Sequence, residues 1–139
     1  MDVDHFKLIN DTYGHAAGDQ VLCAMATLLR TQSRETDVLA RFGGEEFILA
    51  LPETDLDGAR SLAERIRLAV RSEPLCGHTV SLSIGIAHRP ANAKPGGEGA
   101  GEILERLICE ADKALYFGKH HGRDQCRYYP EIADRASSA

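Results

Sequence analysis

Two acidic stretches of this sequence have the residue types and spacing of a metal site. Asp2 and Asp4 flank Val3 at the beginning of the chain, and Glu45 and Glu46 follow two glycines in the segment ARFGGEEFILA. Adjacent carboxylates repel each other, so a hairpin tip does not need two of them side by side. If the first stretch lies at a strand end and the second at a hairpin tip, their carboxylates converge. The alternative is a pair of solvated acidic loops, because acidic turns are common on protein surfaces.

The ligand atoms offered by these side chains are all oxygens, which favours Mg²⁺ or Mn²⁺ over zinc. Mg²⁺ held by a few carboxylates usually completes its shell with water and substrate phosphate. Two such ions form a site for in-line phosphoryl or nucleotidyl transfer, in which one activates the attacking oxygen and the other steadies the leaving group. The acidic stretches are therefore consistent with two Mg²⁺ (or Mn²⁺) ions in each active site.

The strands expected to position these residues are short. Residues 38–41 and 47–51 read as a hairpin, because the Gly43–Gly44 pair between them allows a tight turn. Residues 80–87 alternate large apolar side chains with small ones, which predicts a strand with a helix packed closely over its small side. Residues 125–129 favour an edge strand.

Apolar residues at helical spacing predict helices over residues 19–31 and around residues 103–115. A further helix is expected from Thr54 or Asp55 to about Arg71, because Thr54 and Asp57 resemble a capping box. Strands thus alternate with helices after an initial hairpin. This order predicts an α/β fold in which helices flank a mixed central sheet.

The length and composition suit one globular domain, expected over residues 1–130, followed by a disordered tail over residues 131–139. Residues 91–101 are rich in Gly, Ala and Pro and predict a mobile loop. The net charge of −5 and the lack of a basic run argue against a polymeric nucleic acid partner. No apolar stretch predicts membrane contact, and the four cysteines read as reduced cytosolic thiols, with disulfide pairing as the alternative.

Four segments together resemble the GGDEF family of diguanylate cyclases, in the family's order and with matching gaps from Asp2 to about Tyr128: DVDHFKLINDTYGHAAGDQVL, RETDVLARFGGEEFILALPET, VSLSIGIA and ADKALYFGKHHGRDQ. The resemblance implies an enzyme that condenses two GTP molecules into cyclic di-GMP and releases pyrophosphate. It also implies a fold like that of the nucleotidyl cyclases and the polymerase palm, and a homodimer, because each subunit holds one GTP. The alternative is a catalytically inactive GGDEF-like module that senses cyclic di-GMP or GTP.

The resemblance assigns the metal site to Asp2, the backbone carbonyl of Val3, and Glu45. In the family the residue at Glu45 is also proposed as the base for the 3′-hydroxyl. Lys7, Lys119 and Arg123 match cationic positions around the phosphates, and we expect Lys7 and Glu45 to be the catalytic residues. Cations at these positions stabilise the charge that the transition state develops. Without the resemblance, Lys119 and Arg123 would be ordinary cations of a helix C-terminus.

The guanine base is expected to meet Asn10 and Asp19, with His15 near the nucleotide. A carboxylate accepts hydrogen bonds from N1 and N2 of guanine, whereas adenine would present a lone pair to it. Asp19 could also be a helix N-cap. Arg34 and Asp37 stand at the family's spacing for its RxxD inhibitory site, where arginine grips guanine O6 and N7 and the aspartate accepts from the amine.

The beginning of the chain departs from the family pattern. The family domain normally begins several tens of residues earlier, and Met1 to Asp4 reads as the end of a strand whose body is absent. We therefore expect a domain that lacks its first helix and most of its first strand. Such a chain should be less stable than the full domain and should bind GTP poorly.

Overall fold

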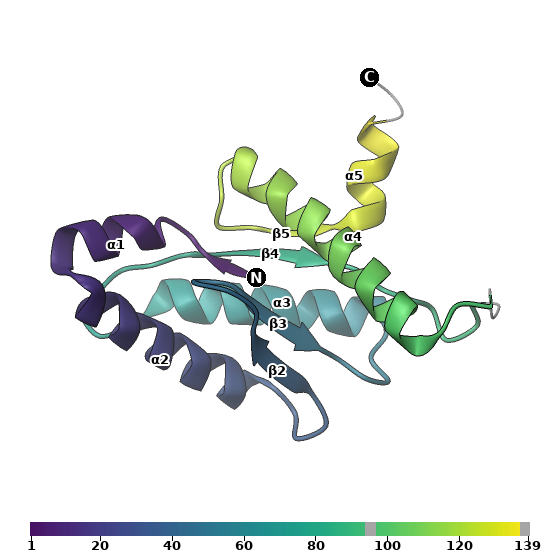
Figure 1. The fold of residues 1–139 in the computed structure, drawn as a ribbon, viewed down its shortest axis with the longest axis horizontal. Coiled ribbons are helices and arrows are strands. Elements are labelled where there is room, and N and C mark those ends of the chain that lie inside the picture. The colour runs from purple at the N-terminus through teal and green to yellow at the C-terminus, as the bar shows by residue number, and fades with distance from the viewer. Residues whose placement is uncertain (94–96, 137–139) are drawn as a thin grey trace.

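The computed structural model describes residues 1–93 and 97–136. In chain order the elements are β1 (Asp2–Val3), α1 (Phe6–Tyr13), α2 (His15–Gln32), β2 (Val38–Arg41), β3 (Phe47–Ala50), α3 (Leu56–Ser72), β4 (Leu82–Ile86), α4 (Ala100–His120), β5 (Cys126–Tyr128) and α5 (Tyr129–Ala136) (Figure 1).

β4 lies between β1, which is antiparallel to it, and β5, which is parallel to it. The hairpin of β2 and β3 meets this sheet at β1, where Asp2 pairs with Glu46 in an antiparallel bridge. The backbone N–H of Phe47 also donates to the carbonyl of Met1 at 2.9 Å. These bonds confirm the predicted α/β fold, a small mixed sheet flanked by helices.

The two faces of β4 differ as the alternating residues predict. Leu82, Ile84 and Ile86 point into the main hydrophobic core, which they share with apolar residues of α2 and α3. Gly85 faces α4 instead, and a Cβ atom added there would lie 1.9 Å from the carbonyl oxygen of Ala111. This close approach confirms that a helix packs over the small side of the strand, and it fixes the position of α4 (Figure 1).

The N-terminal part of the chain contains more helix than the sequence predicted. α1 was not predicted, and α2 begins at His15 rather than at residue 19. Asp19 therefore lies inside a helix, and its alternative role as an N-cap is wrong. Asp55 caps α3, since its carboxylate accepts a hydrogen bond from the Gly58 N–H at 2.8 Å. The helix therefore starts near Asp55 as expected, but its N-cap is Asp55 and not Thr54 of the predicted capping box.

The C-terminal end corrects another expectation. α5 occupies residues 129–136, where a disordered tail was expected from residue 131. Glu131 forms an ion pair with Arg60 of α3, which ties this helix to the body of the domain. Residues 137–139 lie outside the described residues, as do 94–96 of the expected loop at 91–101; α4 begins at Ala100.

The cysteines are present as free thiols, and Cys126 is less exposed than the other three. Within residues 1–93 and 97–136, none of the helices is long and apolar enough to cross a membrane.

Candidate functional site

The two acidic stretches lie side by side, as the sequence predicted. The N–H of Val3 donates to the backbone carbonyl of Glu45 at 3.2 Å, and the backbones of Asp2 and Glu46 form an antiparallel β-bridge. The loop between β2 and β3 is closed by a hydrogen bond from the Phe42 N–H to the Glu46 carbonyl at 2.8 Å. The hairpin tip is thus held against β1 by backbone bonds, which do not depend on the charges that the side chains carry.

Asp2 is buried, with 3% of its surface exposed, and Lys119 supplies its counter-charge. The Nζ atom of Lys119, near the end of α4, lies 2.8 Å from Oδ2 of Asp2. A buried carboxylate is costly unless a cation or hydrogen-bond donors compensate it. The ion pair therefore joins the first residues of the chain to the last turn of α4.

The oxygens of Asp2 and Glu45 fit the coordination chemistry of Mg²⁺. Among the residues that the structure describes, no three His, Cys, Asp or Glu side chains gather closely enough to hold a metal by themselves. Mg²⁺ is usually bound by one or two carboxylates and by substrate phosphates, so a full protein cage is not required. The assignment of such an ion to Asp2, the Val3 carbonyl and Glu45 therefore stays a prediction.

Asn10 has an acceptor that nothing in the described chain satisfies. Its Oδ1 atom is buried and has no hydrogen-bond partner among these residues. It lies over Gly18 of α2, where an added Cβ atom would come within 1.9 Å of it. Gly18 thus provides the space for the Asn10 side chain. This role was not predicted, because the helix was expected to begin at residue 19, after this glycine.

The sequence from Met1 to Gln125 matches the family model described as "Diguanylate cyclase, GGDEF domain". The chain belongs to the GGDEF family. It is 44% identical over 126 residues to "Diguanylate cyclase DgcM" of Escherichia coli (strain K12), an alignment that covers 90% of this chain and 28% of that protein. The chain therefore spans little more than a quarter of this curated relative.

Solved GGDEF structures share the fold. The active GGEEF domain of a diguanylate cyclase from Vibrio cholerae superposes with a TM-score of 0.78 at 36% identity, covering 92% of this chain and 78% of that one. The GGDEF domain of DgcB from Caulobacter crescentus, in complex with c-di-GMP, gives a TM-score of 0.80 at 33% identity, with 93% and 74% covered.

The other residues that the GGDEF resemblance assigns to the site have exposed side chains. Lys7 is exposed on α1, and His15 and Asp19 are exposed on the first turns of α2. Arg123 is exposed in the turn after α4, with a φ angle of 59°. Within the described part of the chain these side chains make no hydrogen bond or ion pair with the Asp2 carboxylate, so their roles remain predictions.

Arg34 and Asp37 face each other across one turn between α2 and β2. Oδ2 of Asp37 accepts a hydrogen bond from the Arg34 N–H at 2.7 Å, and the Asp37 N–H donates to the Arg34 carbonyl at 3.2 Å. Asp37 is buried, and its Oδ1 atom has no partner within the described residues. Arg34 is exposed, and the Asp37 carboxylate contacts its backbone N–H and keeps one acceptor without a partner among the described residues.

Asp4, the second aspartate of the opening stretch, is buried and holds parts of the fold together. Its carboxylate accepts hydrogen bonds from the hydroxyls of Ser81 and Ser83, both at 2.7 Å, and from the Asp124 N–H at 3.0 Å.

On α3, a hydrogen bond from Arg67 lowers the pKa of the Glu64 carboxylate, and the same bond raises the pKa of Arg67.

Proposed function

We propose that this chain is the catalytic domain of a diguanylate cyclase, which condenses two GTP molecules into cyclic di-GMP and pyrophosphate. The observation that carries the proposal is the joining of Asp2 and Glu45 on neighbouring backbone segments by the Val3–Glu45 hydrogen bond. The family match and the diguanylate cyclase relatives support it.

Each residue of the site has a separate task in this proposal. Asp2, the Val3 carbonyl and Glu45 would hold up to two Mg²⁺ or Mn²⁺ ions, which would supply positive charge to the phosphates and increase the acidity of the attacking 3′-hydroxyl. Glu45 lies at the hairpin tip, where it can accept the proton of that hydroxyl as well as bind metal. Lys7, Lys119 and Arg123 supply positive charge to the phosphates, where cations stabilise the transition state.

Guanine recognition is assigned to Asn10 and Asp19, with His15 beside the nucleotide. The unsatisfied Oδ1 of Asn10 supports this assignment, because a buried acceptor without a partner favours a ligand that donates to it. Guanine carries donors at N1 and N2, which suit both the amide oxygen and the Asp19 carboxylate. Adenine lacks this pattern, so we expect the site to prefer GTP over ATP.

The reaction requires two copies of the chain. One site of this kind holds one GTP, and the product contains two nucleotides, so two subunits must face each other as a homodimer. We also propose that cyclic di-GMP inhibits the enzyme by binding to Arg34 and Asp37. The free acceptor on Asp37 and the exposed Arg34 guanidinium support this assignment, and the DgcB domain that resembles this chain was solved in complex with c-di-GMP.

The test is to incubate the chain with GTP and Mg²⁺ and to measure cyclic di-GMP and pyrophosphate by chromatography. A version extended upstream is assayed in parallel. Glu45→Gln, which keeps the size of the side chain and removes its charge, should lose turnover. If neither wild-type version forms cyclic di-GMP, the proposed enzyme activity is refuted.

The second candidate is a module that binds cyclic di-GMP or GTP without turnover. The free acceptors on Asp37 and Asn10 favour it as much as they favour the enzyme, because both belong to binding rather than to chemistry. Calorimetric titration with cyclic di-GMP separates the two: binding in a chain that makes no product would support the module.

A further inference from the structure

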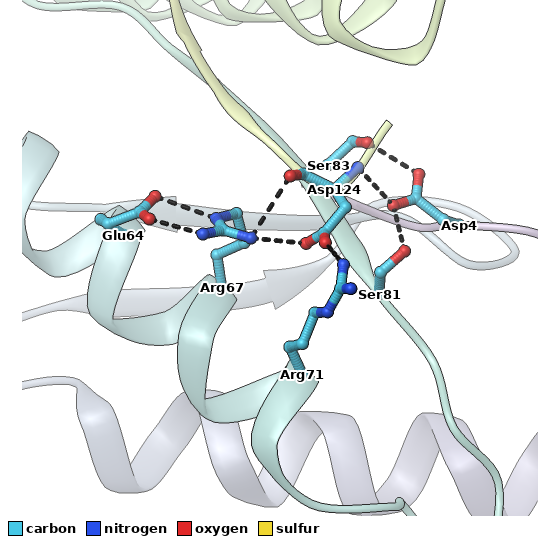
Figure 2. A network of polar contacts seen from close by, with 7 residues as sticks. All are labelled: Asp4, Glu64, Arg67, Arg71, Ser81, Ser83 and Asp124. Carbon is cyan, nitrogen blue, oxygen red and sulfur yellow. Dashed lines mark hydrogen bonds and ion pairs between the residues drawn. The ribbon is translucent and has the colours of Figure 1, made fainter. Parts of the chain in front are cut away.

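A network of polar side chains connects the opening strand to α3 through one residue of the turn after α4 (Figure 2). Asp124 accepts a hydrogen bond from Arg67 of α3 at 2.7 Å, and it forms a second ion pair with Arg71. Its backbone N–H donates to Asp4 at 3.0 Å. Asp4 follows the site residue Asp2 by two positions and is itself buried.

The turn that contains Asp124 has a backbone that must be held in place. Gly122, Arg123 and Asp124 have φ angles of 112°, 59° and 46°. Residues other than glycine rarely adopt positive φ, and such conformations persist only where the surroundings enforce them. Here the enforcing contacts are the hydrogen bond to Asp4, the two arginines of α3, and the bond from the Arg123 N–H to the Gly118 carbonyl at 3.1 Å.

We infer that Asp124 is a positioning residue, which fixes the turn so that Arg123 is presented to the triphosphate of the nucleotide bound at Asp2. This inference rests on the proposed function, since it assigns a task to the same site. Asp124 touches no substrate in this account. It acts by joining Asp4, two residues beyond Asp2, to Arg67 and Arg71, while Lys119 holds Asp2 from the same end of α4.

The degree of burial suggests that the network is built for rigidity. The side chains of Arg67 and Asp124 are 16% and 15% exposed, whereas that of Arg71 is 63% exposed. The pair of Arg67 and Asp124 is therefore the inner clamp, and Arg71 adds charge from solvent. Ion pairs shielded from water hold a geometry more firmly than exposed ones, because water and salt screen them less.

The experiment is a double-mutant cycle on nucleotide binding. Asp124→Asn keeps the shape of the side chain and the backbone bond to Asp4 but removes the charge that binds Arg67 and Arg71. Arg123→Ala removes the side chain that Asp124 is inferred to position. The probe is α,β-methylene-GTP with Mg²⁺, titrated by calorimetry into the wild-type chain, both single variants and the double variant.

If Asp124 acts through Arg123, Asp124→Asn should weaken binding about three-fold to ten-fold in the wild-type background and have no further effect beside Arg123→Ala. This range is below the loss of a whole charge-assisted hydrogen bond, because the arginine is misplaced rather than removed. A merely structural role would give the same loss in both backgrounds, because independent effects add. Such additive losses would overturn the inference while leaving the proposed function standing.

Two further variants provide controls. Figure 2 shows Glu64 and Asp124 on opposite sides of Arg67, so Glu64→Gln removes a carboxylate from the same arginine without touching the turn, and it should leave binding unchanged. If Asp124→Asn fails to fold in thermal unfolding, Arg71→Gln replaces it, with an expected loss of about two-fold that again vanishes beside Arg123→Ala. A wild-type chain that binds no probe refutes the proposed function, and the positioning role with it.

Discussion

Replacing Gly85 by alanine tests the packing that places α4, and with it Lys119, against the sheet. An alanine Cβ at this position would lie 1.9 Å from the Ala111 carbonyl oxygen and 2.6 Å from the Leu115 backbone nitrogen. Both atoms belong to the helix backbone, so rotation of a side chain cannot relieve the clash. An ordinary contact begins at 3.4 Å, and 3.4 minus 1.9 gives a retreat of about 1.5 Å for α4 at this point.

Such a retreat would loosen the packing of Ala114 and Leu115, which are both buried between α4 and the sheet. We expect Gly85→Ala to lower the free energy of unfolding by about 3 kcal/mol, the upper end of the usual range for an overpacked core. For a chain of this size that loss lowers the melting temperature by roughly 10 °C. Urea unfolding followed by circular dichroism measures the free energy, and calorimetry measures the melting temperature.

Gly101→Ala is the matched control. Gly101 lies in the first turn of the same helix, and an added Cβ would meet nothing within 4 Å. Alanine there should stabilise the chain by about 0.5–1 kcal/mol, because it restricts the unfolded state and favours helix. The contrary result is a free energy of unfolding for Gly85→Ala within about 1 kcal/mol of the wild-type value, with Gly101→Ala behaving as expected. That result would mean that α4 does not approach β4 as closely as described.

Three more predictions concern single side chains. Glu45→Ala should abolish formation of cyclic di-GMP while calorimetry still detects cyclic di-GMP binding at Arg34; equal loss of both would indicate unfolding. Arg34→Ala should relieve product inhibition by removing the guanine grip, and an unchanged inhibition curve would exclude this site. Burial, followed by the nearby charge of Glu64, raises the pKa of Cys126 to about 12, so iodoacetamide at pH 8 should modify this thiol at least about a hundred-fold more slowly than the exposed Cys23, as mass spectrometry would show. The thiol of Cys126 loses its proton at a lower pH in the unfolded chain than in the fold, so it should make the fold less stable as the pH rises from about 9 to 12. Equal labelling rates of Cys126 and Cys23 would contradict the raised pKa.

The strands and the long helices could be predicted because their local patterns agree with the final packing. The alternation around β4 identified both its buried face and the close approach of α4. α1 was missed because it is an eight-residue helix with only Phe6 and Ile9 buried, and it follows His5 at a φ angle of 58° with no side-chain cap. Such a helix carries neither a long periodic pattern nor a start signal, so its formation depends on packing against α2.

The site was predictable as far as local patterns and the family resemblance reach. The pairing of the two acidic stretches follows from strand and hairpin signals that the sequence contains. The ion pair of Asp2 with Lys119 and the hydrogen bond from the Asp124 N–H to Asp4 join segments from opposite ends of the chain. No local pattern encodes such contacts, because they depend on how the helices dock onto the sheet.

These long-range contacts also explain how the chain can bring carboxylates together without losing stability. Asp2 and Glu45 are held by backbone hydrogen bonds, which do not weaken when the charges repel each other. The remaining electrostatic cost is offset by Lys119, whose own position depends on α4 lying against Gly85. If Asp2 held a divalent ion, the ion would compensate the charge of this carboxylate, and the ammonium group of Lys119 would be available to a phosphate. Under the proposed function, the lysine that compensates the buried Asp2 would therefore also meet the substrate.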